Sequence, residues 1–258
     1  MYAFRAETLW PALARVKPEN EAGEYYLTDV VRILLGDGKR VATVTAPHEE
    51  IEGVNDRRQL AEAAAIVRAR LLDALMRDSG VTVMDPATTH VEVDVEVGRD
   101  TIVEPFTVIR RGAKIGAGCH VGPFAHISDG AILEDGAEIG NFVEVKRSRI
   151  GKKAKAKHLA YIGDGDVGER ANIGAGTIFC NYDGKNKSKT KIGERAFIGS
   201  GSLLVAPVEI GAGATTGAGA VVTRGKLVPP GEVWAGVPAR PISKSGNGAA
   251  AGKSGGKG

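Results

Sequence analysis

The sequence predicts a mainly β protein: a left-handed parallel β-helix of hexapeptide repeats, preceded by a small α/β segment and a linker helix. Three observations predict this fold. Aliphatic residues recur every six positions, glycine is abundant at 36 residues, and aromatic residues make up only 5% of the chain. Many glycines together with plentiful valine and isoleucine are typical of short strands joined by tight corners, not of a closely packed helical core.

The six-residue period is continuous over ten positions, which makes a chance pattern very improbable. Small residues recur between the aliphatic ones, as at Ala113, Ala125 and Ala137. Six residues make one short strand and one corner, so three repeats close a triangular coil and successive coils stack as parallel strands. The aliphatic residues that we expect to point into the axis are Val91, Val97, Val103, Ile109, Ile115, Val121, Ile127, Leu133, Ile139 and Val145.

The period is interrupted twice. It slips near Ile150 and resumes at Val167 and Ile173, and it stops again at residues 181–191 before continuing from Ile192 through Ile198, Leu204 and Ile210. The segment NYDGKNKSKTK is polar, rich in lysine and contains an Asp-Gly turn signal, so we expect it to protrude as a loop. Such a loop is either a tolerated surface insertion or a device that completes a site on a neighbouring subunit.

The chain divides into four expected parts. Residues 1–55 are interpreted as mixed α/β, with helices in TLWPALARV and TDVVRILLGDG and an alternating strand in RVATVTA. Residues 56–80 are the linker helix, whose apolar stripe includes Leu60, Val67 and Leu72. Residues 81–242 form the β-helix, and residues 243–258 are a flexible low-complexity tail.

Composition narrows the class of protein. The net charge of +3 comes from 34 basic and 31 acidic residues that are interspersed, so we expect no nucleic-acid partner. Cys119 and Cys180 do not suggest a disulfide framework and fit a reducing compartment. The N-terminal segment does not have the pattern of a signal peptide, and no apolar run is long enough for a membrane span. We therefore expect a soluble cytoplasmic protein.

Four segments carry a specific resemblance to a known family. They are IGNFVEVK (139–146), KHLAYIGD (157–164), ANIGAGTIFCNYDGKNK (171–187) and SLLVAPVEIGAGATTGAGAVVTR (202–224). Together they resemble the C-terminal acetyltransferase domain of the bacterial bifunctional N-acetylglucosamine-1-phosphate uridylyltransferase/glucosamine-1-phosphate acetyltransferase. The resemblance implies acetyl-CoA-dependent N-acetylation of glucosamine 1-phosphate, a step in the synthesis of UDP-N-acetylglucosamine for the cell wall. It also implies a homotrimer whose sites lie between subunits.

The resemblance places the catalytic base at His158. N-acetylation needs a neutral amine, and a histidine can accept the proton as the amine attacks the thioester. Lys146 and Lys187 resemble the lysines that hold the sugar phosphate, Asn172 resembles a sugar-binding amide, and Tyr161 would line the same site. Outside this motif context, each of these residues would be an ordinary solvated or space-filling side chain.

The resemblance also implies a binding site for acetyl-CoA. Its expected contacts are Ala175, Asn181, Tyr182, Ser200, Ala218 and Arg240. The alanines and the serine also have a plain structural explanation, because the corners of the β-helix need small residues, and Arg240 could equally be a solvated residue near the end of the domain. The implied mechanism is direct acyl transfer without an acyl-enzyme, and Cys180 is interpreted as a small buried hydrophobe.

The chain departs from the family at two places. The nucleotidyltransferase domain is represented only by a remnant in residues 1–55, where Asn55 matches a metal-binding asparagine without its aspartate partner. One neutral ligand holds Mg²⁺ poorly, so Mg²⁺ is expected only if a separate uridylyltransferase half is supplied. In addition, GPFAHISD places Ser128 where the family's phosphate-binding arginine is expected.

Two alternatives stay open at the level of sequence. An inactive or scaffold subunit that pairs with a separate uridylyltransferase half would bind that half without turning over acetyl-CoA. A metal-dependent hydratase like the γ-class carbonic anhydrases would use His120 and His126, which are one repeat apart.

Overall fold

A computed structural model describes residues 1–242 and shows two compact units, Met1–Ala64 and a second unit that begins at Ala65. The division falls within helix α4 (Arg57–Arg77), which matches the expected linker helix. The flexible tail expected at residues 243–258 lies outside the described residues. No helix among residues 1–242 is long and apolar enough to cross a membrane.

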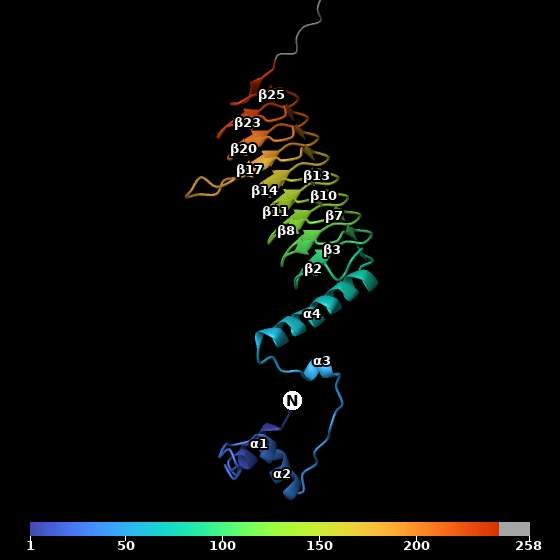
Figure 1. Cartoon of the computed structure of the whole chain (residues 1–258), viewed down its shortest axis with the longest axis vertical. Helices are drawn as coiled ribbons and strands as arrows, with labels where there is room; N and C mark the ends of the chain where they lie inside the picture. The colour runs from blue at the N-terminus through green and yellow to red at the C-terminus, as the bar shows by residue number, and fades with distance from the viewer. Residues whose placement is uncertain (243–258) are drawn as a thin grey trace, which may run out of the picture. The chain divides into compact units, whose positions relative to one another are not determined.

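The second unit is the expected left-handed parallel β-helix, a prism with three sheets (Figure 1). Sheet A contains β1 (Thr82–Val83), β4 (Ile102–Val103), β7 (His120–Val121), β10 (Glu138–Asn141), β13 (Lys155–His158), β16 (Asn172–Ile173), β19 (Phe197–Ile198), β22 (Thr215–Thr216), β25 (Val233–Ala235) and β26 (Arg240–Pro241). Only β26 runs antiparallel to its neighbour among these strands.

The other two sheets are built in the same way from every third strand. Sheet B contains β2 (His90–Val91), β5 (Val108–Ile109), β8 (His126–Ile127), β11 (Glu144–Lys146), β14 (Tyr161–Gly163), β17 (Ile178–Cys180), β20 (Leu203–Val205) and β23 (Val221–Val222). Sheet C contains β3 (Glu96–Val97), β6 (Lys114–Ile115), β9 (Ile132–Leu133), β12 (Arg149–Ile150), β15 (Gly165–Val167), β18 (Thr190–Ile192), β21 (Val208–Ile210) and β24 (Leu227–Val228).

The axis of the prism is filled by the aliphatic residues that the period predicted. Val103, Ile109, Ile127 and Leu133 are almost completely buried, and all belong to one continuous core. Small residues occupy the corners, and Ala113 and Ala137 are fully buried there. Burying this apolar surface contributes about 25 cal/mol per Å², so the stacked aliphatic rows are the main stabilising feature of the unit.

Between Val145 and Ile173 the expected slip of the period is present, and the coils continue through it. The steps from Val145 to Ile150 and from Ile162 to Val167 are five residues instead of six, and β12 to β15 keep their places in the sheets. Both short steps lie at the corner where the chain passes from sheet B to sheet C. Because the corner is one residue shorter, the next aliphatic side chain still points into the axis. The interruption therefore changes the length of a corner and leaves the fold unchanged.

One residue at most corners of the prism adopts a positive φ. At the corner between sheets A and B these residues are Phe106, Phe124, Phe142 and Leu159 in the first coils. In the later coils they are Gly176, Gly201 and Gly219. Side chains other than glycine, asparagine and aspartate are uncommon in this conformation, so the run of bulky residues is unusual.

The N-terminal unit contains only helices, which corrects the expectation of a mixed α/β segment. Helix α1 (Ala6–Leu13) packs on α2 (Thr28–Gly36) around Ala12 and Val30, and α3 is the short helix His48–Ile51. The expected strand at residues 40–46 is absent from the described structure, and these residues lie almost entirely exposed. A single strand without a neighbour is not stable in water, which explains why the alternating pattern does not produce one.

The apolar stripe expected on α4 is only partly buried. Leu72 and Leu75 pack into the core of the prism, whereas Leu60 and Val67 are exposed. The expected stripe is therefore correct only for the C-terminal turns of the helix.

We expect that a variant lacking residues 1–55 keeps the prism folded. The core of the prism begins at Leu72, and the buried cluster of the N-terminal unit is separate from it. Far-ultraviolet circular dichroism and a thermal melt of the two proteins check this expectation. Cooperative loss of the β signal in the shortened protein would refute it.

Candidate active site

A single column of residues lies beside the corner between sheets A and B. His158 pairs with Asn141 one coil earlier. The same column continues through Ala175 and Ser200 in the following coils, because the amide of Gly176 donates to the His158 carbonyl and that of Gly201 to the Ala175 carbonyl. Ala218 is the next member, since Gly219 donates to Ser200. The expected base and three expected acetyl-CoA contacts are therefore stacked in register.

His158 has one defined side-chain partner. Its Nδ1 lies 2.7 Å from Oδ1 of Asn141. An amide oxygen can only accept, so this hydrogen bond favours the tautomer with the proton on Nδ1 and leaves the Nε2 lone pair free. The imidazole is exposed and borders a hollow of about 210 Å³, whose other walls come from sheet A residues including Glu138, Gly140 and Lys157. An oriented imidazole with a free nitrogen beside an open hollow can act as a general base.

The shape of the corner changes at the level of His158. The corner residues up to that level are bulky, ending with Phe142 and Leu159. Beyond it they are Gly176, Gly201 and Gly219, with φ of +72°, +70° and +67°. Glycine adopts this left-handed backbone without strain and leaves the corner residue without a side chain. The corner beside Ala175, Ser200 and Ala218 is therefore free of the bulky side chains found in the earlier coils.

A second group of expected residues meets at the corner between sheets B and C. A Cβ atom added at Gly163 would lie 2.5 Å from the Tyr161 hydroxyl and 2.7 Å from Nδ2 of Asn181, so these two polar groups converge over the glycine. Lys146 is in register with Gly163 in the preceding coil. Tyr161, Asn181 and Lys146 thus form one polar cluster, but none of them lines the hollow beside His158.

Asp164 holds Asn181 of this cluster in place. Its carboxylate accepts two hydrogen bonds of 2.8 Å from Arg147 and a further one from the Asn181 amide. The hydrogen bonds from Arg147 lower the pKa of Asp164, and burial opposes them. Arg147 is consequently engaged in a bidentate ion pair, and the lysines remain the less constrained cations of this corner.

The expected loop occupies residues 181–189 and leaves the prism at the same corner, between β17 and β18 (Figure 1). It ends two residues earlier than expected, because Thr190 and Lys191 pair in sheet C. Asp183 organises it: Oδ1 accepts from the amides of Lys185 and Asn186, and Oδ2 accepts from Arg224 at 2.9 Å. These hydrogen bonds, with that from Asn186 first, lower the pKa of Asp183 to about 2.

The remaining expected residues are spread over the chain. Lys187 and Tyr182 lie exposed in the loop, where they form an isolated bridge. Asn172 is half-buried on sheet A between Lys155 and Phe197. Arg240 is exposed in β26 and pairs with Ala235 at the end of the prism.

Asn141 and Asp164 were not selected from the sequence. Both lie within the matching segments IGNFVEVK and KHLAYIGD, but their roles depend on the coil register. Asn141 is 17 residues before His158, a spacing that includes one five-residue step. A count of the inward residues across that step would have found it.

A metal site is not supported. Asn55 lies exposed before α4, and its backbone amide donates to the side-chain oxygen of Gln59. The described residues contain no group of three or more His, Cys, Asp or Glu side chains that could hold a metal. His120 faces outward from sheet A next to Glu104, while His126 lies on sheet B next to Arg110, so the two histidines of the hydratase alternative do not converge.

Cys180 does not have the environment of a nucleophile. Burial raises the pKa of its thiol, and the same cause raises that of Cys119. A thiol with a raised pKa is poor in thiolate, which agrees with direct transfer and not with an acyl-enzyme.

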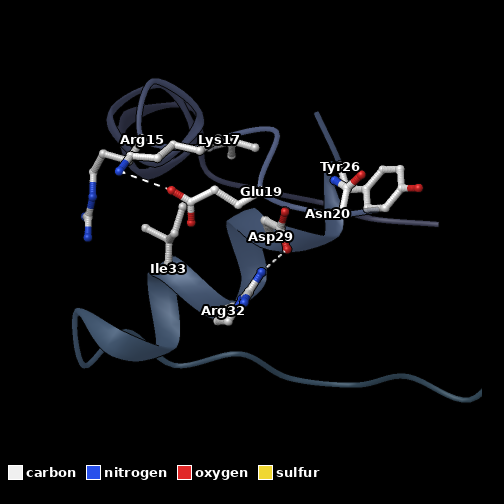
Figure 2. A pocket seen from close by; sticks show the side chains of 9 residues that line it. Arg15, Lys17, Glu19, Asn20, Tyr26, Asp29, Arg32 and Ile33 are labelled. Atoms are coloured by element: carbon white, nitrogen blue, oxygen red, sulfur yellow. Dashed lines mark hydrogen bonds and ion pairs between the residues drawn. The ribbon is translucent and has the colours of Figure 1, made fainter. Parts of the chain in front are cut away.

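The N-terminal unit contains a hollow of about 370 Å³ that is lined by α2 and by the segment joining α1 to α2 (Figure 2). Its charged lining residues pair with one another: Lys17 with Glu19, Arg32 with Asp29, and Arg15 with Asp37 nearby. Because these charges are mutually neutralised, the hollow does not present a group poised for chemistry.

Comparison with known proteins finds hexapeptide-repeat proteins that are similar to this chain. Residues 112–147 and 189–224 match the family described as bacterial transferase hexapeptide (six repeats). The bifunctional protein GlmU of Thermobifida fusca is 51% identical over 90% of this chain and 54% of its own length. GlmU of Zymomonas mobilis is 45% identical over 86% of this chain and 53% of its own length. LpxA from Acinetobacter baumannii has a TM-score of 0.47 at 17% identity, covering 62% of this chain and 73% of that chain.

The prism and its repeats are similar to those of the bacterial transferase hexapeptide family over the matched residues. Over most of its length the chain is also similar to the bifunctional GlmU proteins. The chain spans about half the length of the curated relatives that it matches.

We expect the Asp183→Ala variant to lose protection of the Lys185 and Asn186 amides against hydrogen exchange. In the native protein the lowered pKa keeps the carboxylate charged, so its stabilising effect is complete above the unfolded value near pH 4 and is lost as pH falls through about 2. Protection in the native protein should therefore persist from pH 7 to pH 4. The Arg224→Gln variant is the matched control, because it removes the ion pair and leaves the turn; equal protection in all three proteins would contradict the assignment.

Proposed function

We propose that the chain transfers the acetyl group of acetyl-CoA to the amino group of glucosamine 1-phosphate, giving N-acetylglucosamine 1-phosphate for UDP-N-acetylglucosamine synthesis. The observation that carries the proposal is His158, oriented by Asn141 beside an open hollow and followed along the same corner by glycines. The relation to GlmU proteins supports the same reaction. The two free cysteines fit the reducing cytoplasm, where we place the reaction.

His158 is the general base in the proposed mechanism. Nε2 accepts a proton from the amine as the amine nitrogen forms a bond to the thioester carbonyl carbon. The tetrahedral adduct then breaks its carbon–sulfur bond, and the departing thiolate receives the proton from Nε2. Asn141 holds the other ring nitrogen throughout, so the lone pair stays directed into the hollow.

The proposed path of acetyl-CoA follows the A–B corner beyond His158. Ala175, Ser200 and Ala218 lie there in register with His158, and the adjacent corner glycines carry no side chain. Backbone groups can approach a ligand closely where no Cβ intervenes. Arg240, at the end of the prism, and Tyr182 and Asn181, at the loop, would contact the more distant parts of the cofactor.

The sugar phosphate is assigned to Lys146, Lys187, Tyr161 and Asn172. Lys146 and Lys187 supply compact positive charges, and Tyr161 and Asn172 supply neutral polar groups for the sugar. The proposal does not include uridylyl transfer. Asn55 supplies one neutral ligand, and the described residues contain no group of three or more His, Cys, Asp or Glu side chains that could hold a metal, so Mg²⁺ belongs to the proposal only if a separate uridylyltransferase half supplies the remaining ligands.

The assembly that we propose is a homotrimer. His158 lies at the A–B corner, whereas Lys146 and the loop that carries Lys187 lie at the B–C corner, with the outer face of sheet B between them. A single copy therefore separates residues that one acetyl transfer must bring together. Neighbouring copies in a closed ring can reunite them.

We expect His158→Ala to reduce acetyl transfer by about 100-fold or more, because a positioned general base contributes at least that factor. The measurement is thiol release from acetyl-CoA in the presence of glucosamine 1-phosphate. His90→Ala is the matched control, since His90 is an exposed imidazole of β2 that does not line the hollow beside His158. Absence of sugar-dependent thiol release in the native protein would overturn the proposed function.

We expect Ser128→Arg to lower the KM for glucosamine 1-phosphate by about 10-fold, since a charged hydrogen bond contributes roughly 1.4 kcal/mol. Ser128 precedes Lys146 by one coil, and its amide donates to the Val145 carbonyl at 2.8 Å. An arginine there can therefore reach the phosphate held by Lys146. Ser128→Gln provides a side chain of similar length without charge, and an equal effect of both substitutions would contradict a role for charge.

A further inference from the structure

One residue, Asp164, joins both ends of the loop at residues 181–189 to the prism. At the first end, its carboxylate accepts a hydrogen bond from the side-chain amide of Asn181. At the other end, its carbonyl oxygen accepts a hydrogen bond from the backbone amide of Thr190 at 3.2 Å. Asn181 is 7% exposed and Thr190 is completely buried, so both attachments lie away from solvent. Because both are made to one residue, the position of Asp164 sets the position of the loop.

The two arms of the loop are also joined to each other. The amide of Ser188 donates to the carbonyl of Asn181 at 2.8 Å, and Tyr182 forms a bridge with Lys187. Lys187 is therefore connected to Asp164 through hydrogen bonds that begin at Asn181. A displacement of Asn181 moves Lys187 with it.

Asp164 is itself held by the preceding coil. Arg147 donates two hydrogen bonds of 2.8 Å to its carboxylate, and the amide of Asp164 donates to the carbonyl of Lys146 at 3.0 Å. The side chain is only 14% exposed. The φ of Asp164 is +51°, a left-handed conformation that aspartate adopts more often than most residues other than glycine. The coil with Lys146 and the loop with Lys187 are thus linked by one fixed residue.

The charges at this corner indicate what the link is for. Asp164 neutralises Arg147, whereas Lys146 and Lys187 form no ion pair within residues 1–242. The hydrogen bonds from Arg147 are the main cause that lowers the pKa of Asp164, and the charge of Lys187 acts in the same direction, so its ammonium group lies near the carboxylate. Two unpaired ammonium groups match a phosphate monoester, whose charge near neutral pH is about −1.5 to −2.

We propose that Asp164 is a positioning residue for acetyl transfer, which holds the loop so that Lys187 meets the sugar phosphate at a fixed distance from Lys146. The inference rests on the proposed function, which assigns both lysines to that phosphate. Asp164 does not touch the ligand, because its carboxylate is engaged by Arg147 and Asn181. His158 lies at the A–B corner, so the loss of Asp164 weakens substrate binding and leaves the proton transfer intact.

The first test is the kinetics of the Asp164→Asn variant, which keeps the size of the side chain and removes its charge. The KM for glucosamine 1-phosphate should rise about 10-fold and kcat should stay within about twofold of native, since a binding contact is lost without a change at the base. Asp166→Asn is the matched control, because Asp166 pairs with Arg149 at 3.0 Å and is more than half exposed on sheet C. A lower kcat with an unchanged KM would overturn the proposal.

The second test combines Asp164→Asn with Lys187→Ala. If Asp164 acts by placing Lys187, the double variant should have the KM for glucosamine 1-phosphate of Lys187→Ala alone, because the side chain to be placed is already absent. A KM that rises by the product of the two single effects would show that Asp164 acts independently of Lys187, and the proposal would be wrong.

The third test measures the hold on the loop without any activity. The amides of Ser188 and Thr190 should exchange hydrogen about 10-fold faster in Asp164→Asn, as expected when a charged hydrogen bond is lost. The amide of Gly193, which donates to Ile210 within sheet C, should keep its native rate. Unchanged exchange at Ser188 and Thr190 in a folded variant would overturn the proposal.

Circular dichroism must show the native β signal in each variant. If Asp164→Asn does not fold, Asn181→Leu takes its place in the exchange measurement, because it removes the same hydrogen bond from the side of the loop and leaves the pair of Asp164 with Arg147. A native protein that shows the expected exchange but does not acetylate glucosamine 1-phosphate would contradict the proposed function and leave Asp164 as the anchor of the loop.

Discussion

The structure depends on one packing constraint: an aliphatic side chain must meet its equivalent in the coils before and after it. Ile109, Ile127, Val145 and Ile162 show this arrangement along sheet B, where each is completely buried. The coil spacing is that of paired strands. A coil that is one residue shorter must therefore still place its inward side chain at the same position in the row. The inward row is therefore fixed, and variation is confined to the corners and the outward positions.

The corners are where the chain acquires chemistry. At the A–B corner the period is kept, and the corner residue is bulky on one side of His158, as at Phe142 and Leu159, and glycine on the other, as at Gly176 and Gly201. At the B–C corner the period is broken. The five-residue steps bring Arg147 and Asp164 into a bidentate ion pair, and the hydroxyl of Ser148 accepts from the Gly165 amide at 2.7 Å. The loop leaves from the next coil of this same corner.

The parts that could be predicted from the sequence follow the inward row. The aliphatic period and the small corner residues predicted the β-helix, and the polar run after Asn181 predicted the loop, because both patterns depend on nearby residues only. The strand expected at residues 40–46 was wrong, since a strand needs a hydrogen-bonded neighbour that a pattern of valines and threonines does not supply. Asn141 was missed because its approach to His158 depends on the coil register, and one step of that register is five residues long.

The two corners divide the proposed reaction between them. Where the six-residue period is kept, equivalent residues of successive coils stack in a column parallel to the axis of the prism. The column that contains His158 suits a long ligand. A broken period produces a local cluster of charges and a projecting loop, which suit a compact anionic ligand. One face of the prism separates these corners, so the positions of both groups of residues follow from the same triangular cross-section that the fold imposes.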